Sequence, residues 1–228
     1  MIMTKTIYKH IDLSDKRKVY AVGDIHGCYD KLRTALANVD FDGNKDALIS
    51  LGDLVDRGPQ NLEAVEWIKH PWFHRVLGNH ELMTMEHALG ESYLHTMNGG
   101  GWMEPLTPDE KRDMAIALND APFMLEVDTP KGLNVGFVHA DLRWASWQAN
   151  IDNPDERTFC WSREGVKNLR DPAYEPIITG IDKVFFGHNA LYNPFSRGNC
   201  SWIDTGSGFE DGKLTIVDVD TFGSMVTE

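Results

Sequence analysis

Short runs of apolar residues recur along the chain, and each run ends in a polar cluster. Five such runs are present, at residues 19–22, 47–51, 73–77, 135–138 and 184–186. Runs of this length with few polar interruptions are typical of strands that are buried on both faces. The pattern therefore predicts five buried strands at these positions.

Segments with helical spacing separate the first three runs. Their apolar positions are Tyr29, Leu32, Leu36 and Val39 in the first segment, and Leu62, Val65, Trp67 and Ile68 in the second. Apolar residues three or four positions apart form one face of a helix. The alternation of strand and helix predicts right-handed crossovers and a parallel core, hence an α/β fold.

The rest of the chain has a less regular pattern. Residues 82–123 are predicted to be mainly helical, with an interruption at the glycine run 98–101, and to cover one side of the site. The aromatic segment after Ala140 is predicted to be rich in loops. Residues 201–204 and 214–219 are predicted as late strands, with turns at 206–208 and 211–212. Because no repeat or linker stands out, we expect one domain over residues 1–228, with its core at about 19–219.

Composition narrows the class of protein. The chain has 228 residues, of which 42% are hydrophobic and 25% charged, which is typical of a folded globular protein. Its 35 acidic and 22 basic residues give a formal charge of −13. This charge argues against a sequence-independent nucleic-acid partner, which would require clustered lysine and arginine. A phosphate substrate remains compatible, because bound metal cations reverse the field locally.

The cysteines and the apolar segments indicate a compartment. Cys28, Cys160 and Cys200 are odd in number and form no CxxC pair, which favours reduced thiols in a cytoplasmic protein. The first 13 residues contain no uninterrupted apolar stretch of the kind found in signal peptides. No segment approaches the roughly 20 apolar residues that span a bilayer, so no membrane partner is expected.

Potential metal ligands follow the predicted strands. In chain order they and their polar neighbours are Asp24, His26, Asp53, Asp56, Arg57, Asn79, His80, His139 and His188. In an open α/β sheet the carboxyl ends of the strands converge on one crevice, where ligands bind. Carboxylate, imidazole and carboxamide groups without thiolates suit Mn, Fe or Zn held for hydrolysis. The pattern therefore predicts a metal site at this edge.

Each of these residues taken alone has a simpler explanation. An aspartate after a strand is commonly a helix N-cap, and an isolated histidine is more often a packed or surface residue than a ligand. The simpler explanation is applied to the histidines that lack a surrounding motif, which are His10, His70, His74, His87 and His95. For the strand-end residues the simpler explanation is weakened, because a polar residue of this kind follows the predicted strand at five separate places.

The motifs at these positions resemble those of a known family. Gly-Asp-Ile-His-Gly at 23–27, Gly-Asp-Leu-Val-Asp-Arg-Gly at 52–58 and Gly-Asn-His-Glu at 78–81 look like the three signature motifs of the PPP-type phosphoprotein phosphatases. The segments 138–141 and 186–188 resemble the two later histidine motifs of this family. The segments 98–102 and 161–164 look like parts of the small bacteriophage lambda-type enzymes.

The resemblance implies a fold and a set of residue roles. The fold would be that of a calcineurin-like metallophosphoesterase, with two mixed β-sheets packed as a sandwich and flanked by helices. The first of two divalent ions would be held by Asp24, His26 and Asp53, and the second by the bridging Asp53 with Asn79, His139 and His188. His80 would face the leaving-group oxygen with Asp56 bonded to it, and Arg57 and Arg163 would bind the phosphoryl oxygens. Manganese is the expected metal, with iron and zinc as alternatives.

These roles predict a phosphomonoesterase. Two ions roughly 3.5–4 Å apart can lower the pKa of a water between them, so that hydroxide forms near neutral pH and attacks phosphorus. The serine or threonine alkoxide that departs needs a general acid such as His80. The expected substrates are phosphoserine and phosphothreonine in proteins or peptides, with phosphotyrosine as a further candidate. A free-standing monomer is favoured.

Two other functions compete with this interpretation. Symmetrical diadenosine tetraphosphate hydrolases resemble this chain in their metal motifs, but they typically lack an acidic residue where Asp56 stands. Asp56 and the Trp-Ser-Arg-Glu segment at 161–164 therefore favour a protein phosphatase. A catalytically idle metal-binding protein would have lost a ligand or the general acid, and this chain keeps all of them. The glycine run 98–101 is either a mobile rim over the site or a plain turn.

Overall fold

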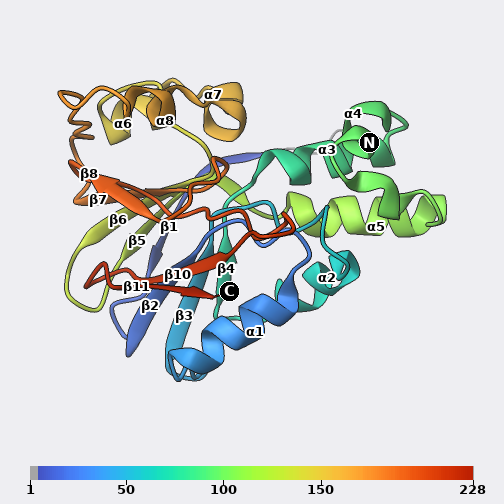
Figure 1. Ribbon diagram of the computed structural model, residues 1–228, viewed down its shortest axis with the longest axis horizontal. Helices are drawn as coiled ribbons and strands as arrows, with labels where there is room; N and C mark the ends of the chain where they lie inside the picture. Colours follow the sequence, from blue (N-terminus) through green and yellow to red (C-terminus); the bar gives the residue numbers. More distant parts are fainter. Residues whose placement is uncertain (1–4, 228) are drawn as a thin grey trace.

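Two β-sheets pack face to face, with helices on both outer sides, in the computed structural model, which describes residues 5–227 (Figure 1). The five-stranded sheet has the order β11 (Ser224–Thr227), β10 (Leu214–Asp218), β2 (Lys18–Val22), β3 (Asp46–Ser50), β4 (Phe73–Arg75). The six-stranded sheet has the order β1 (Thr6–Asp12), β5 (Pro122–Asp128), β6 (Asn134–Val138), β7 (Lys183–Phe186), β9 (Cys200–Trp202), β8 (Phe195–Arg197).

Both sheets are mixed, as the resemblance implies. β2, β3 and β4 are parallel to one another, which confirms the predicted parallel core, while β10 and β11 extend this sheet by antiparallel pairing. In the other sheet β6, β7 and β9 are parallel, and β5 pairs antiparallel with β6. The carboxyl ends of the parallel strands in the two sheets supply the residues of the predicted site.

The strands read as continuous apolar runs because each contributes to two different cores. Tyr20 and Val22 point toward α1 (Tyr29–Asn38), on the outer face of the five-stranded sheet. The alternate residues Val19 and Ala21 belong to the core between the sheets. Successive residues of a strand point to opposite faces of the sheet, and because both faces are buried here, apolar residues occupy successive positions.

The helices form groups on the two outer sides (Figure 1). The remaining helices are η1 (Asn61–Glu63), α2 (Ala64–Trp67), α3 (Asn79–Ala88), α4 (Tyr93–Met97), η2 (Gly100–Met103), α5 (Pro108–Asn119), α6 (Trp147–Asp152), α7 (Glu156–Trp161) and α8 (Glu164–Asn168). Among the described residues, none of these is long and apolar enough to cross a membrane.

Two parts of the predicted secondary structure need correction. The helical segment 82–123 ends at Asn119, because β5 begins at Pro122 and includes Phe123. The segment after Ala140, predicted to be rich in loops, contains the short helices α6, α7 and α8. The first two have polar N-caps, since Ser146 accepts a hydrogen bond from the amide of Ala149 and Asp155 accepts one from Thr158.

Candidate metal centre

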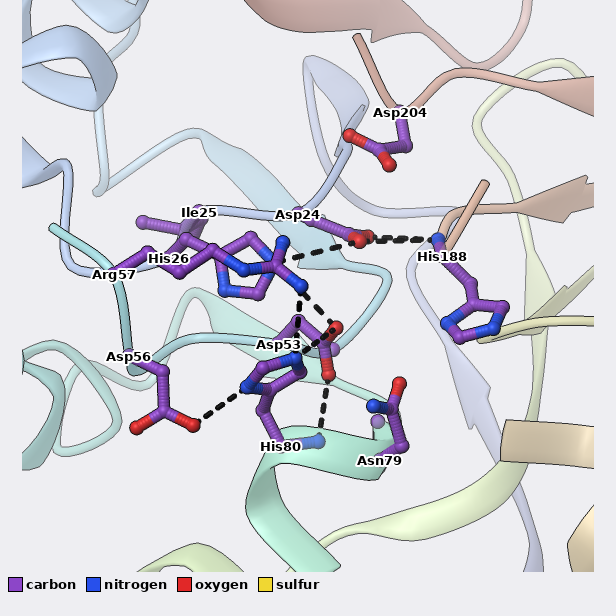
Figure 2. A network of polar contacts seen from close by, with 12 residues as sticks. Asp24, Ile25, His26, Asp53, Asp56, Arg57, Asn79, His80, His188 and Asp204 are labelled. Carbon is purple, nitrogen blue, oxygen red and sulfur yellow. Dashed lines mark hydrogen bonds and ion pairs between the residues drawn. The ribbon is translucent and has the colours of Figure 1, made fainter. Parts of the chain in front are cut away.

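The strand ends bring the predicted ligands together at one edge of the two sheets (Figure 2). Asp24 follows β2, Asp53 follows β3 and Asn79 begins α3 after β4, while His139 and His188 follow β6 and β7 of the other sheet. All are buried except His188, which is partly buried. Among the His, Cys, Asp and Glu side chains described, the donor atoms of His26, Asp53 and His80 lie within 4.8 Å of one another, and so do those of Asp53, His139 and His188. Asp24 is in neither group. Asp53 is shared by both groups.

Two of the histidines are oriented by backbone carbonyl groups. His26 Nδ1 lies 2.9 Å from the carbonyl oxygen of Val55, and His139 Nδ1 lies 2.6 Å from that of Leu51. Because a carbonyl oxygen only accepts, each Nδ1 carries a proton, and Nε2 is the ring nitrogen that faces the cluster. A hydrogen bond of this kind behind the ring is the usual support of a metal-ligating histidine.

The donor set fits a divalent cation. His188 Nε2 is buried and, among the described residues, has no hydrogen-bond partner. Burial lowers the pKa of His188 to about 3 and that of His26 to about 3, so both imidazoles are neutral, the form that binds metals. Burial would also lower the pKa of His139, but Asp53 and Asp24 raise it to about 10. The carboxylates therefore favour positive charge at this point, which a divalent ion would supply.

Asp204 is a further buried carboxyl group beside the cluster, and the sequence analysis did not single it out. Burial raises the pKa of Asp204 to about 6, and burial together with the charge of Asp204 raises that of Asp24 well above its usual range. Asp204 follows β9, which lies next to β7 in the six-stranded sheet. The strand-end rule, applied to this late strand as well, would have found it.

The backbone at the site is held in an uncommon conformation. Seven non-glycine residues among those described have positive φ, and five of them belong to the site, namely His26, Asp53, Asp56, Arg57 and His188. This left-handed region costs free energy for residues with a Cβ atom, about 1–3 kcal/mol each. Such a concentration of strain is typical of a functional site.

Glu81 holds the loop after β3 in place. One carboxylate oxygen accepts hydrogen bonds from the amides of Asp53, at 2.9 Å, and Gly78, at 2.8 Å, and the other accepts one from Leu54 at 2.8 Å. Gly78 is required at its position, because a Cβ atom there would clash with Asp53 Oδ1. The sequence analysis quoted Glu81 within its motif but assigned it no role.

Asp56 and His80 form the predicted pair. Asp56 Oδ2 lies 2.5 Å from His80 Nδ1 (Figure 2), and the other ring nitrogen of His80 faces the cluster, 3.8 Å from Asp53 Oδ2. Burial would raise the pKa of the Asp56 carboxyl group, but hydrogen bonds from His80 and His95 hold it below its usual value. Asp56 is therefore an ionised carboxylate with no direct access to solvent.

The two predicted phosphate-binding arginines, Arg57 and Arg163, are both exposed. Arg57 Nη1 lies 2.5 Å from His26 Nε2, and Arg57 Nη2 lies 3.2 Å from His80 Nε2. The Arg57 guanidinium also stacks on Phe209, 4.8 Å from the ring centroid. Arg163 is the N-cap of α8 and contributes to the lowered pKa of His188.

A groove of about 930 Å³ opens beside the cluster. Arg163, Trp161 and Leu94 are among its lining residues, whereas none of the six predicted ligands lines it. The glycine run 98–101 forms a tight turn between α4 and η2. Gly99 has φ +105° and lies against Arg57, and Gly100 lies against the ring of His95.

Comparison with known proteins agrees with this geometry. Residues 17–215 match the calcineurin-like phosphoesterases. The chain belongs to the calcineurin-like phosphoesterase family. The PPP-type resemblance and the fold that it implies are thereby confirmed, and this phosphoesterase is a metal-dependent hydrolase.

Relatives of this phosphoesterase include two kinds of enzyme. It is 36% identical to serine/threonine-protein phosphatase 1 of Salmonella typhimurium over 222 residues, or 95% of this chain and 98% of that protein. Over only 95 residues it is 43% identical to the symmetrical bis(5'-nucleosyl)-tetraphosphatase of Methylococcus capsulatus, covering 40% of this chain and 34% of that protein. The crystal structure of a "putative diadenosine tetraphosphatase" has a TM-score of 0.72 at 21% identity, with 97% of each chain covered, and shares the fold.

Proposed function

We propose that this phosphoesterase is a serine/threonine protein phosphatase that uses two divalent metal ions. The observation that carries the proposal is the hydrogen bond of 2.5 Å between Asp56 and His80 at the edge of the metal centre. Hydrolysis of phosphoserine expels an alkoxide, which is a poor leaving group and requires a proton. A buried carboxylate that orients His80 supports the proposed role of this histidine as the general acid for such a substrate.

The other side chains divide into two proposed ligand sets. Asp24, His26 and Asp53 would hold one ion, and Asp53, Asn79, His139 and His188 the other. Bound divalent ions would supply Lewis-acid charge to the phosphoryl group and to the attacking water. His80 lies within reach of the first set, but its hydrogen bond differs from those of His26 and His139. Its partner is a carboxylate rather than a backbone carbonyl, and this contact sets His80, the proposed proton donor, apart from the two proposed histidine ligands.

Arg57 and Arg163 would bind the phosphoryl oxygens. Guanidinium groups recognise phosphate by paired hydrogen bonds, and Arg163 is an exposed residue that lines the groove. His26 Nε2 cannot accept a hydrogen bond from Arg57 and bind an ion at once. The proposed roles therefore require the Arg57 guanidinium to turn from His26 toward the phosphate.

The substrate class is supported by the extent of the similarity. The Salmonella protein phosphatase aligns with nearly the full length of this chain, whereas the Methylococcus tetraphosphatase aligns with less than half. We propose a phosphoprotein or phosphopeptide substrate, with phosphotyrosine also accepted, manganese as the metal and a monomer as the active form. All three cysteines are free, which agrees with the proposed cytoplasmic location.

Symmetrical dinucleotide tetraphosphate hydrolysis is the second candidate. The Methylococcus enzyme and the structural neighbour favour it, because both are named for this activity. A dinucleotide would need a site for its two bases, and Phe209 beside Arg57 is an exposed ring that one base could stack on.

One experiment separates the two candidates. The protein would be stripped with chelator and reloaded with manganese, and phosphate release would be measured from phosphoserine, phosphothreonine and phosphotyrosine peptides and from diadenosine tetraphosphate. Manganese-restored activity that prefers the peptides is expected. A preference for the dinucleotide would contradict the proposed substrate, and no activity on any of these compounds would favour an idle metal-binding protein.

A further inference from the structure

Three N–H groups surround the Asp56 carboxylate, although the family motif accounts for only one. Asp56 Oδ2 accepts a hydrogen bond from His80 Nδ1. Asp56 Oδ1 lies 2.8 Å from His95 Nε2 and 2.6 Å from Trp102 Nε1. Both additional residues come from the helical segment that covers this side of the site, His95 from α4 and Trp102 from η2. We refer to Asp56, His80, His95 and Trp102 as the Asp56 cluster.

The protonation of His95 follows from its neighbours. His95 Nε2 faces two acceptors, Asp56 Oδ1 and the hydroxyl oxygen of Thr84 at 3.2 Å, whose own proton is donated to the carbonyl oxygen of His80 at 2.8 Å. Nε2 of His95 therefore carries a proton. His95 Nδ1 lies 2.9 Å from His87 Nδ1, and His87 Nε2 lies 3.5 Å from the ammonium group of Lys111.

These contacts form a chain with one direction. A lysine ammonium can only donate and a carboxylate can only accept. A path of hydrogen bonds can therefore run from Lys111 through His87 and His95 to Asp56. Every ring nitrogen along this path then has a partner. Glu104 Oε1 lies 3.7 Å from His87 Nε2, outside hydrogen-bond distance.

The packing around His95 leaves the ring no alternative place. His95 is completely buried, and a Cβ atom on Gly100 would clash with its ring. A buried carboxylate that loses one of its donors is held less firmly about its Cβ–Cγ bond, and its other oxygen is then less well aligned with its partner. Removal of a donor to Asp56 Oδ1 would therefore disturb the hydrogen bond between Asp56 Oδ2 and His80.

We propose that His95 and Trp102 are positioning residues for the general acid: they fix the Asp56 carboxylate so that His80 points its proton at the leaving-group oxygen. The inference rests on the proposed acid role of His80 and extends it to two residues from the helical cover. His95 was predicted to be a packed or surface histidine without a functional role. Its contact with Asp56 supports a positioning role in addition to packing.

The test compares two substrates that differ in their need for a proton. Phenyl phosphate has a poorer leaving group than 4-nitrophenyl phosphate, and neither is a peptide or a nucleotide, so the result is independent of the natural substrate. In manganese-loaded His95→Leu, the ratio of kcat on phenyl phosphate to kcat on 4-nitrophenyl phosphate should fall about tenfold. Simple damage to the fold would lower both rates alike and leave the ratio at its wild-type value.

Two further variants keep the test decisive if His95→Leu folds poorly. In His95→Gln the side-chain amide can donate to Asp56, so the ratio should stay within about threefold of wild type. Trp102→Phe removes only the Nε1–H donor and should lower the ratio in the same direction as His95→Leu, by less. His74→Leu, a histidine of β4 outside the Asp56 cluster, is the matched control.

A spectroscopic readout does not need turnover. The proton between His80 Nδ1 and Asp56 should give a downfield proton NMR signal that shifts in His95→Leu and returns in His95→Gln. An unaltered signal, an unchanged ratio in both His95→Leu and Trp102→Phe, or a glutamine variant as impaired as the leucine variant would overturn the inference. A wild-type protein inactive on both phosphates would contradict the proposed function instead, and the NMR signal would still decide the positioning role.

Discussion

The ligand cluster and the arginine rim of this phosphoesterase are built in different ways. In the cluster nearly every side chain is buried and has a second contact behind it, such as the carbonyl oxygens of Val55 and Leu51 behind His26 and His139. On the rim, Arg57 and Arg163 are exposed and have no ion pair among the described residues. The cluster is therefore preorganised, whereas the rim can adjust to its substrate.

This difference separates two requirements of the reaction. Ligands and the general acid must be held within a fraction of an ångström, and burial with supporting hydrogen bonds achieves this. Phosphate-binding groups must also admit and release a substrate, which exposed side chains allow. Substitutions in the cluster should therefore abolish function, and substitutions on the rim should weaken it.

The largest effect is expected from Asp53→Asn. Asp53 is shared by both groups of donor atoms, so its loss should weaken the binding of both ions and lower turnover about a thousandfold or more. Manganese content after dialysis, measured with kcat, checks this. Asp40→Asn is a suitable control, because Asp40 also has positive φ but lies outside the site. Two tightly bound ions in Asp53→Asn would refute the bridging assignment.

His80→Asn should have the next largest effect. Loss of a general acid lowers turnover about 10²- to 10⁴-fold, chiefly for phosphoserine, whose leaving group is poor. The manganese content should stay at the wild-type value, because the acid is not one of the proposed ligands. Turnover on a phosphoserine peptide and metal analysis of the same sample test both statements. Loss of manganese would instead identify His80 as a ligand.

Arg163→Lys tests the rim. Lysine keeps the charge but cannot make paired hydrogen bonds to phosphate, so kcat/KM should fall about tenfold while manganese binding is retained. Arg170→Lys, at an exposed arginine just beyond α8, is the matched control. A fall as large as that of Asp53→Asn would mean that the rim is as preorganised as the cluster.

The smallest effect is expected for His74, whose pKa is shifted by burial rather than by carboxylates. Partial burial lowers the pKa of His74 to about 4, whereas the pKa of the fully buried His139 is raised to about 10 by carboxylates. The unfolded chain binds this proton more tightly, with a pKa of about 6.5, so His74 makes stability fall as pH decreases from 6.5 to 4. The loss at pH 4 is at most about 3 kcal/mol. In His74→Gln, urea unfolding should show a weaker decline over this window, and an identical decline would contradict the assignment.

Most of the parallel core could be predicted from the sequence, because its signals are local. Strands such as β2 and β3 are apolar on both faces, and the polar residues that follow them are close in the chain. β1 was missed because it is an edge strand with a polar, half-exposed sequence, and its pairing with β5 joins residues more than a hundred positions apart. No local pattern encodes such a pairing.

The site was predictable in its inner part and less so around it. The proposed ligands stand at strand ends within short motifs, so their convergence follows from topology alone. His95 and Asp204 carry no motif, and their contacts with Asp56 and Asp24 depend on how separate elements pack. The phosphate contacts of Arg57 and Arg163, which the resemblance implies, remain a prediction.

The proposed ligands are divided between the two sheets: Asp24, Asp53 and Asn79 belong to the five-stranded sheet, and His139 and His188 to the six-stranded sheet. The ion proposed to bind Asp53, Asn79, His139 and His188 would act as a cross-link between the two sheets, which otherwise contact each other through apolar side chains. Its binding free energy would add to the folding free energy, since neither sheet alone holds the full set. This ion would therefore bind late in folding, because its ligands come together only after the strands of both sheets have packed.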